Sequence, residues 1–230
     1  MGNFIKDLVI NSQFKGTARA LRWDMMRLGA RMRSGRMLRR LTAKGPLSTK
    51  LHFGSGSRKV QGWLNCDVTQ TDVDIDLGCG KLPFPSAYFE AAVAQHVIEH
   101  LALEEELLPL LRDLHRCMKP GGEVWLSCPD MQKVCESYVR DKGQGLVLDK
   151  QTRWPNYSTH GYYVSHVVND LFHQTGQHKN LFDFDLLKDV LQKAGFREVT
   201  HEQESTLLAR YPEFPPRRDD FHALYVRAVK

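Results

Sequence analysis

Short apolar runs alternate with longer amphipathic or polar stretches through residues 49–130. Four runs, at Lys50–Phe53 and residues 63–66, 91–95 and 123–128, have the length of buried strands, and residues 73–77 form a weaker one. Residues 104–118 repeat leucines every three or four positions, as one face of a helix does, and Pro120-Gly121-Gly122 ends that pattern. Strands that alternate with crossovers predict a parallel, doubly wound α/β sheet.

The C-terminal third continues this pattern after an interruption. Residues 131–180 show no clear period, are rich in histidine and aromatic residues, and are expected to be an irregular insert. Residues 183–194 have helical spacing with Gly195 as the stop, and residues 197–202 and 221–229 read as two final strands joined by a loop, residues 210–218, with three prolines. We therefore expect one domain, residues 49–230, with the insert at about 131–180.

The N-terminal segment, residues 1–48, is basic and is expected to be helical. Leu21, Met25, Leu28 and Met32 form one helical stripe, Gly35 is expected to interrupt the helix, and Gly45-Pro46 ends the segment. Residues 1–50 hold 12 Lys/Arg and 2 acidic residues, a charge of +10, whereas the remaining residues hold 20 basic and 25 acidic ones, a charge of −5.

This charge distribution leaves three interpretations of residues 1–48. By default, a solvated helix packs its Leu/Met stripe on the body. Alternatively, the helix lies on an anionic membrane surface as a peripheral contact, or it clamps an anionic substrate such as a phosphorylated lipid-linked sugar. Nucleic acid is not favoured as a partner, because the acidic body offers no broad phosphate-binding face.

Targeting signals and cysteines favour a cytoplasmic protein. The chain has no run of about 18 apolar residues and no signal-peptide pattern at its start. Gly2 could suggest myristoylation, but that pattern requires Ser or Thr at position 6, which is Lys6 here. The five cysteines are odd in number and include no C-x-x-C pair, so we expect reduced thiols.

A glycine-rich turn, Gly54-Ser55-Gly56, follows the first predicted strand, and Asp67 ends the second. Such a turn lets backbone N–H groups approach a ligand, and an acid at the second position binds ribose hydroxyls in doubly wound folds. The full G-x-G-x-x-G fingerprint is missing, which counts against a nicotinamide or flavin dehydrogenase. A competing turn, residues 76–80, is less suitable because Pro83 and Pro85 follow it.

These motifs resemble those of a known family. The matching segments are residues 51–56, 62–67, 76–84 and 89–101, then Met118-Lys119-Pro120-Gly121-Gly122 and the strand ending Ser127-Cys128-Pro129-Asp130. In this order they are similar to class I S-adenosylmethionine-dependent methyltransferases, specifically the methyltransferase-type-11-like group often associated with polysaccharide and glycolipid biosynthesis.

The resemblance implies a seven-stranded Rossmann-like sheet with its last strand antiparallel, S-adenosyl-L-methionine as cofactor and S-adenosyl-L-homocysteine as product. It implies that the glycine turn wraps the methionine and ribose portion, that Asp67 holds the ribose, and that Asp76 and Leu77 lie beside the adenine. Gln95 and His96 would face the sulfonium and the acceptor. The family's acid two residues before the first glycine is replaced by His52.

Histidines supply the candidate catalytic groups. His96-Val97-Ile98-Glu99-His100 matches a short H-x-x-E-H zinc-protease pattern, but it falls where the family has a similar segment, so we reject that interpretation. His160, His166, His173 and His178 in the insert could bind metal or act as a base, or be hydrogen-bonded loop residues; we assign no metal. We rank His166, His178 and then His96 as the base, and place Asp130, Trp154, Tyr157 and Tyr162 at the acceptor.

The predicted activity is methyl transfer to a small-molecule or glycan acceptor, most simply O-methylation of a sugar or lipid-linked saccharide. Two alternatives stay open: N-methylation of a small amine or aminosugar, which needs no strong base, and a catalytically silent cofactor-binding subunit that supports a partner enzyme.

Overall fold

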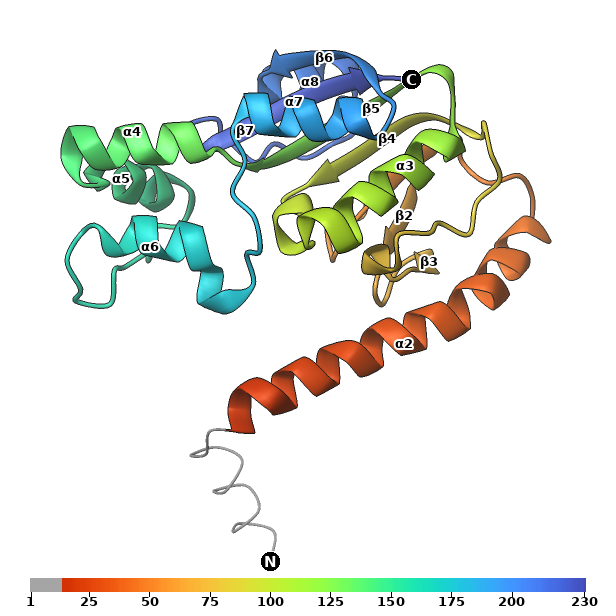
Figure 1. Cartoon of the computed structure of the whole chain (residues 1–230), viewed down its shortest axis with the longest axis horizontal. Coiled ribbons are helices and arrows are strands. Elements are labelled where there is room, and N and C mark those ends of the chain that lie inside the picture. The colour runs from red at the N-terminus through yellow and green to blue at the C-terminus, as the bar shows by residue number, and fades with distance from the viewer. Residues whose placement is uncertain (1–13) are drawn as a thin grey trace, which may run out of the picture.

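The computed structural model describes residues 14–230. Its centre is one seven-stranded sheet in the order β3-β2-β1-β4-β5-β7-β6 (Figure 1). β1 to β5 pair in parallel, and β7 runs antiparallel to both of its neighbours, which confirms the predicted α/β sheet with an antiparallel last strand. The strands are β1 Lys50–Phe53, β2 Leu64–Asp67, β3 Val73–Asp74, β4 Phe89–Gln95, β5 Met118–Pro129, β6 Arg197–Glu202 and β7 Ala223–Val229.

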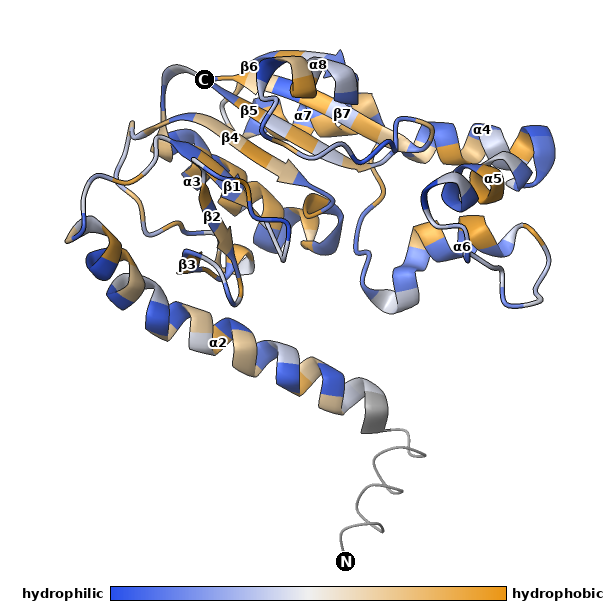
Figure 2. Ribbon diagram, turned by 180° about the vertical axis from the view of Figure 1, so that it is seen from behind, coloured by the Kyte–Doolittle hydropathy of each residue, from blue (hydrophilic) through white to orange (hydrophobic). Residues whose placement is uncertain are grey.

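Two helices cover one face of the sheet, α3 Leu108–Cys117 and α7 Phe184–Lys193 (Figure 1). Their leucines form the main core with β1, β4 and β5, because the apolar face of each helix can be buried only against the sheet. The opposite face carries α8 Glu204–Arg210 and the loop that follows it (Figure 2). Trp63, Tyr211 and Phe214 form a second cluster there, so both faces are covered although only one carries long helices.

The predicted helix of residues 104–118 begins one turn late as an α-helix. Residues Leu103–Leu107 form a π-turn, and Met118 already belongs to β5. Short 3₁₀ turns follow two other strands: η1 Leu77–Cys79 and η2 Ile98–His100. These turns place side chains at the carboxyl ends of β3 and β4, where a ligand of such a sheet binds.

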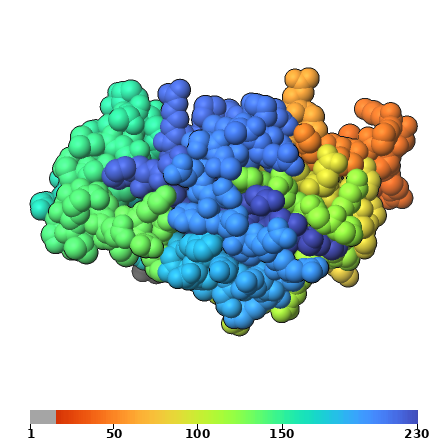
Figure 3. Space-filling model, turned by 90° about the horizontal axis from the view of Figure 1, so that it is seen from above, coloured from red at the N-terminus to blue at the C-terminus, as the bar shows by residue number. Residues whose placement is uncertain are grey.

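The expectation of an irregular insert at 131–180 is wrong. This segment forms α4 Met131–Asp141, α5 Gln144–Arg153 and α6 His166–His173, joined by loops. The helices share a small apolar cluster of their own that includes Val134, Leu146 and Val167. Each helix contributes few core positions, which hides the helical period in the sequence. The three helices lie at one end of the sheet rather than over it (Figures 1 and 3).

Helix α2, Phe14–Thr42, is continuous through Gly35, so the predicted interruption there is wrong. A glycine inside a helix costs only about 1 kcal/mol, which the rest of the helix tolerates. The helix runs along the β3 edge of the sheet (Figure 1), and its C-terminal turns add Met37, Leu38 and Leu41 to the main core. Among the described residues, no helix is both long and apolar enough to cross a membrane.

The way α2 meets the body contradicts the default interpretation of the N-terminal segment. The predicted Leu/Met stripe does not pack: Leu21, Met25, Leu28 and Met32 are 57–74% exposed. Arginines face the body instead, because β3 and the turn after it present buried carboxylates to this helix. The apolar stripe is therefore largely exposed, although Leu21 and Met25 line a hollow that also includes Thr69 of the body.

All five cysteines, Cys66, Cys79, Cys117, Cys128 and Cys135, are free, as the sequence predicts. Cys66, Cys117 and Cys128 are buried, and burial raises the pKa of each of these thiols. These buried thiols are therefore protonated and act as small apolar core residues.

Candidate active site

The candidate cofactor site lies where the strand order reverses, at the carboxyl ends of β1 and β4. Gly54 follows β1 with φ +67°, a conformation that favours glycine. A Cβ on Gly54 would also lie 2.2 Å from Cγ2 of Val97, which follows β4. The turn can thus approach the next strand, and a ligand beside it, only because no side chain stands at this position.

Asp67 connects the glycine turn to β2. Its Oδ2 accepts a hydrogen bond from the N–H of Gly56 at 2.8 Å, and its Oδ1 accepts one from the N–H of Val68 at 2.6 Å. Each carboxylate oxygen has a second lone pair. Asp67 is half-buried at the strand end, so the residue can hold the turn and still accept hydrogen bonds from ribose hydroxyls.

Three buried side-chain atoms near these strand ends have no hydrogen-bond partner: Ser55 Oγ, Gln95 Nε2 and Ser127 Oγ. Gln95 and Ser127 are paired in register at the ends of β4 and β5, and Ser55 is the middle residue of the glycine turn. Buried polar groups are normally hydrogen-bonded, so these atoms are what a polar ligand would satisfy. The residues present therefore fit S-adenosylmethionine at this site.

Asp76 and Leu77, which are expected to lie beside the adenine, follow β3, and Asp76 contacts arginines of helix α2. Arg27 Nε donates to Asp76 Oδ1 at 2.8 Å, and Arg31 Nε donates to Oδ2 at 2.6 Å. Asp76 Oδ1 also accepts from the N–H of Gly78 and so caps η1. Leu77 is buried in the main core. Helix α2 thus supplies two arginines to the carboxylate that the sequence assigns to the adenine.

His52, which stands where the family has an acid, is neutral and packed. Burial lowers the pKa of His52 to about 4, although its ring bonds to Asn65 at 3.2 Å. The ring meets Phe214 edge-on at 5.0 Å and belongs to the aromatic side of the second cluster. A neutral ring cannot replace the ionic contact of a carboxylate with an ammonium group.

Arg217 approaches the same end of β4 from the proline-rich loop. Its guanidinium donates to the backbone carbonyl of Gln95 at 3.1 Å, its Nε has no hydrogen-bond partner, and burial lowers its pKa. Arginine stays charged in proteins, so this group offers a cation to a carboxylate. The sequence analysis missed Arg217, whose only signal is the dense charge of Arg217-Arg218-Asp219-Asp220.

His96 forms the strongest polar pair of the site. Its Nε2 lies 2.7 Å from Oδ2 of Asp219, and its Nδ1 lies 3.4 Å from Oε1 of Glu99. Burial lowers the pKa of His96, but the hydrogen bond to Asp219 and the nearby charge of Glu99 outweigh burial and raise it. His96 also has φ +57°, a left-handed conformation that is uncommon for a side-chain-bearing residue and clusters at functional sites.

Asp219 is the partner that the sequence analysis missed, because it lies in the loop before β7, far along the chain from His96. Its Oδ1 accepts a hydrogen bond from the Tyr225 hydroxyl at 2.7 Å. Burial would raise the pKa of Asp219, but the hydrogen bond to His96 outweighs this and holds it well below its usual range. Asp219 is therefore an ionised, buried carboxylate that orients the His96 ring.

Of His166 and His178, which the sequence ranks above His96, only His178 lies near the end of β4. His166 begins α6 and stacks at a tilt on Tyr162, with ring centroids 5.1 Å apart. His178 has Nδ1 2.6 Å from the carbonyl oxygen of Leu171 and its ring 4.9 Å from that of His100. Burial lowers the pKa of His178. The structure brings His178, and not His166, to the residues after β4.

The predicted acceptor residues are spread over the end of β5 and the loop between α5 and α6. Asp130 is buried and caps α4 through the N–H groups of Gln132 and Lys133. Tyr157 is half-buried, whereas Trp154 and Tyr162 are exposed. A cavity of about 490 Å³ next to Trp154 is lined by Thr152, Arg153, Pro216 and Arg218, between α5 and the proline-rich loop. This cavity has basic walls, so an anionic or hydroxyl-rich group fits it.

Comparison with known proteins finds a family model that matches part of the chain. Residues 59–126, from the loop after β1 to within β5, match the model of a family described as a methyltransferase domain. The sheet order with its reversed last strand agrees with that match. This part of the chain therefore resembles a methyltransferase domain. A search of curated proteins gave no significant match.

Solved structures similar to this chain include three S-adenosylmethionine-dependent methyltransferases. The enzyme from Thermotoga maritima has 15% identity and a TM-score of 0.45, with 94% of this chain and 97% of that chain covered. The one from Archaeoglobus fulgidus has 15% identity and a TM-score of 0.45, with 87% and 94% covered. The one from Mesorhizobium loti has 16% identity and a TM-score of 0.43, with 79% and 90% covered.

Proposed function

We propose that this methyltransferase transfers the methyl group to a hydroxyl of a small-molecule or glycan acceptor, such as a sugar or lipid-linked saccharide. The observation that carries the proposal is the 2.7 Å pair between His96 and Asp219 beside the end of β4. A neutral hydroxyl must lose its proton as the new bond forms, whereas an amine needs no strong base. A histidine oriented by a buried carboxylate is the arrangement that general-base catalysis uses.

S-adenosylmethionine supplies the electrophilic methyl group. The raised pKa of His96 favours its charged form between Asp219 and Glu99, so the ring must first give up the Nδ1 proton. In the neutral ring that results, Nε2–H donates to Asp219, and Nδ1, on the side of Glu99, is the nitrogen that would take the acceptor's proton. With the cofactor bound, the acceptor's O–H proton would pass to His96 as the O–CH₃ bond forms, and the cofactor sulfur would keep the electron pair of the S–CH₃ bond. Asp219 stabilises the imidazolium that results, and Arg217 is placed to hold a carboxylate at the methionine end.

The test compares His96→Gln and Asp219→Asn with the matched variant His166→Gln. S-adenosylhomocysteine release is measured on hydroxyl acceptors that are first found by incubating extracted metabolites and glycans with labelled cofactor. We expect kcat to fall on the order of 10²–10⁴-fold for the first two variants, with unchanged cofactor affinity by calorimetry, and to stay near wild type for His166→Gln. Wild-type turnover by His96→Gln would exclude the base role of His96. If the labelled methyl group is found only on amines, N-methylation would be favoured.

The silent-subunit alternative has its own readout. Calorimetry with S-adenosylmethionine and S-adenosylhomocysteine measures binding without needing an acceptor. Binding of both ligands without turnover on any acceptor pool would favour a supporting subunit over an enzyme. If neither ligand binds, the cofactor site assigned to β1 and β4 is wrong.

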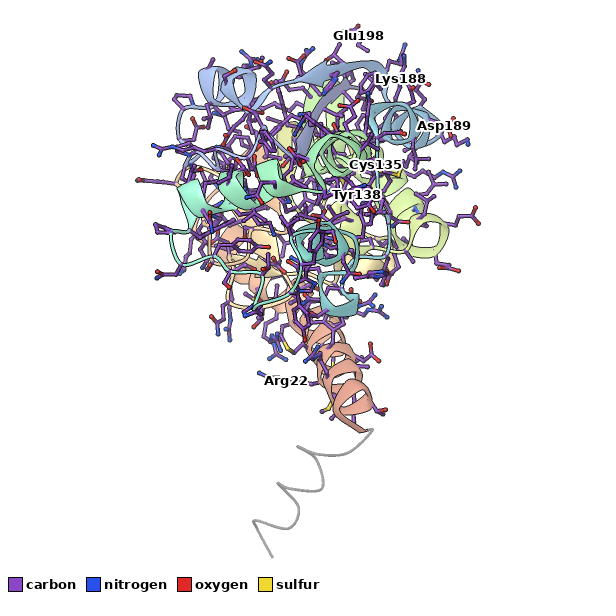
Figure 4. The ribbon with its side chains drawn as sticks, turned by 90° about the vertical axis from the view of Figure 1, so that its left-hand side faces the viewer. Arg22, Cys135, Tyr138, Lys188, Asp189 and Glu198 are labelled. Atoms are coloured by element: carbon purple, nitrogen blue, oxygen red, sulfur yellow. The ribbon has the colours of Figure 1, made fainter. Side chains whose placement is uncertain are left out.

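We further propose that α2 brings this cytoplasmic methyltransferase to an anionic membrane surface. The exposed stripe Leu21, Met25, Leu28 and Met32 lies on a helix that also carries free arginines, an arrangement typical of interfacial helices. Arg22 projects from the part of α2 that extends beyond the body (Figure 4). The arginines bound to the body fix the helix so that the apolar stripe faces outward.

Vesicle co-sedimentation tests this surface. Vesicles of zwitterionic lipid with and without anionic lipid are mixed with wild type and with the Leu21→Ser/Met25→Ser/Leu28→Ser/Met32→Ser variant. Val139→Ser/Leu148→Ser, which removes two exposed apolar side chains from α4 and α5, is the matched control. We expect salt-sensitive binding to anionic vesicles that only the stripe variant loses. Equal binding by all three proteins would contradict the proposal.

A further inference from the structure

Three possible metal ligands meet beside the active site. Glu99 and His100 lie in η2, directly after β4, and His178 lies in the segment that joins η4 Gln174–Gly176 to α7. One ligand atom from each residue lies within 4.8 Å of the other two. Two imidazoles and one carboxylate are the ligand set of many catalytic zinc sites, whose bond lengths of about 2.0–2.2 Å place neighbouring ligand atoms a few ångströms apart.

Both histidine rings have the same nitrogen committed to a backbone carbonyl. His178 Nδ1 lies 2.6 Å from the oxygen of Leu171, and His100 Nδ1 lies 3.2 Å from the oxygen of Gln177. A carbonyl oxygen can only accept, so each Nδ1 carries the proton. The lone pair of each neutral ring is therefore on Nε2, and a carbonyl bonded to the opposite nitrogen is the usual support of a metal-binding histidine.

Glu99 supplies an independent sign of a missing partner. Its side chain is almost completely buried, at 1% exposure, and neither carboxylate oxygen has a hydrogen-bond partner. Nδ1 of His96 forms an ion pair with Oε1 at 3.4 Å, but without hydrogen-bond geometry. A buried carboxylate whose oxygens accept no hydrogen bond is destabilising, so a cation in addition to His96 would stabilise this side chain.

The backbone holds the two segments in place without any ligand. The N–H groups of Lys179 and Asn180 donate to the carbonyl of Glu99 at 2.8 and 3.2 Å, and the side chain of Asn180 donates to the carbonyl of Leu101. His178 is thus fixed next to Glu99 and His100 by its own neighbours in sequence. A site held in this way is pre-organised, because little ordering remains for a bound ion to impose.

We propose that Glu99, His100 and His178 bind one divalent transition-metal ion, with Zn²⁺ as the best match. Imidazole nitrogen suits zinc and its neighbours in the first transition row, whereas Mg²⁺ and Ca²⁺ prefer ligand sets made of oxygen. The three side chains leave one position of a tetrahedral ion for water or an acceptor oxygen. The ion ties the 171–180 segment to the end of β4, beside His96. The site differs from the H-x-x-E-H pattern, because His96 pairs with Asp219.

The test measures metal binding directly and needs no acceptor, so its outcome is separate from that of the proposed methyl transfer. The full chain is dialysed against a chelator and titrated with Zn²⁺ by calorimetry, and with Co²⁺ by visible absorption. The variants are His178→Ala and Glu99→Gln, and His173→Ala, an exposed histidine of the same segment, is the matched control.

We expect one equivalent of Zn²⁺ for wild type and His173→Ala, with Co²⁺ bands of a four-coordinate site. His178→Ala and Glu99→Gln should each lower the affinity for Zn²⁺ at least about tenfold. Changes to residues that only support a metal ligand already lower metal affinity by about that much. Circular dichroism checks that each variant is folded, and a Zn²⁺-dependent rise in Tm that His178→Ala lacks is a second readout. The proposal is overturned if wild type binds no stoichiometric Zn²⁺, or if His178→Ala binds it as tightly as wild type. In either case Glu99 would be neutralised by His96 alone.

Discussion

The attachment of α2 through Asp76 gives a sharp prediction about stability. Arg27 and Arg31 both donate to this carboxylate, whose side chain is 2% exposed, but Arg27 is 20% exposed and Arg31 is 51% exposed. A hydrogen bond to a charged group contributes about 1.5–3 kcal/mol when it is sheltered, and an exposed pair contributes about 0.2–1 kcal/mol. We therefore expect the Arg27–Asp76 interaction to stabilise the fold clearly more than the Arg31–Asp76 interaction.

Two double-mutant cycles measure the difference. Arg27→Met, Asp76→Asn and the double variant form the first cycle, and Arg31→Met replaces Arg27→Met in the second. Urea unfolding should give a coupling energy of about 1–2 kcal/mol for Arg27, which is half-buried, and below about 0.5 kcal/mol for Arg31. Salt at 1 M should weaken the Arg31 coupling more than the Arg27 coupling, because salt screens exposed charges.

The same variants address the adenine side of the cofactor site. If Asp76 serves chiefly to hold α2, Asp76→Asn should change S-adenosylhomocysteine affinity by less than about threefold, or about 0.65 kcal/mol. A tenfold loss would mean that the carboxylate also contacts the adenine, as the sequence predicts. The reasoning about burial fails if Arg31 couples as strongly as Arg27, or if the Arg27 coupling is below about 0.3 kcal/mol.

Two further predictions concern the cofactor turn and its neighbour. The pKa of His52 is lowered from 6.5 to about 4 by burial, so between these pH values the unfolded chain binds a proton that the folded chain excludes. The free energy of unfolding should fall by up to about 3 kcal/mol as pH drops from 6.5 to 4, and His52→Leu should flatten this part of the urea-derived profile relative to exposed His201→Leu. Gly54→Ala should abolish calorimetric cofactor binding and lower Tm, because its Cβ would clash with Val97. Adding Val97→Ala to Gly54→Ala should restore part of the Tm, because it removes the clash but does not relieve the strain of a positive φ at an alanine. Normal cofactor binding by Gly54→Ala alone would refute the argument.

The sheet was largely predictable because each strand is encoded locally. The apolar runs of β1, β2, β4 and β5 are bounded by glycine, proline or acidic residues, and the antiparallel β7 follows from the resemblance. The helices of the 131–180 segment were not predictable, since their core positions are shared among three short elements. Local periodicity cannot reveal a cluster whose members come from different helices.

The active site divides in the same way. The glycine turn and the acid after β2 follow from sequence, because short-range geometry determines both. The His96–Asp219 pair joins β4 to the loop before β7, and the Glu99–His100–His178 cluster joins η2 to the segment before α7. No spacing rule connects such distant positions, so His166 ranked as high as His178 in sequence although only His178 reaches this end of the sheet.

The sequence by itself determined that a basic arm precedes an acidic α/β body, because charge and hydrophobic period are properties of composition and order. Only the tertiary structure decided which side of the arm meets the body. The Leu/Met stripe predicts burial on any helical wheel, but the edge of the sheet presents the buried carboxylates of Asp74 and Asp76, which attract arginines more strongly than apolar groups. The arginines therefore turn inward and the stripe faces out, because what a helix face binds depends on the surface it meets.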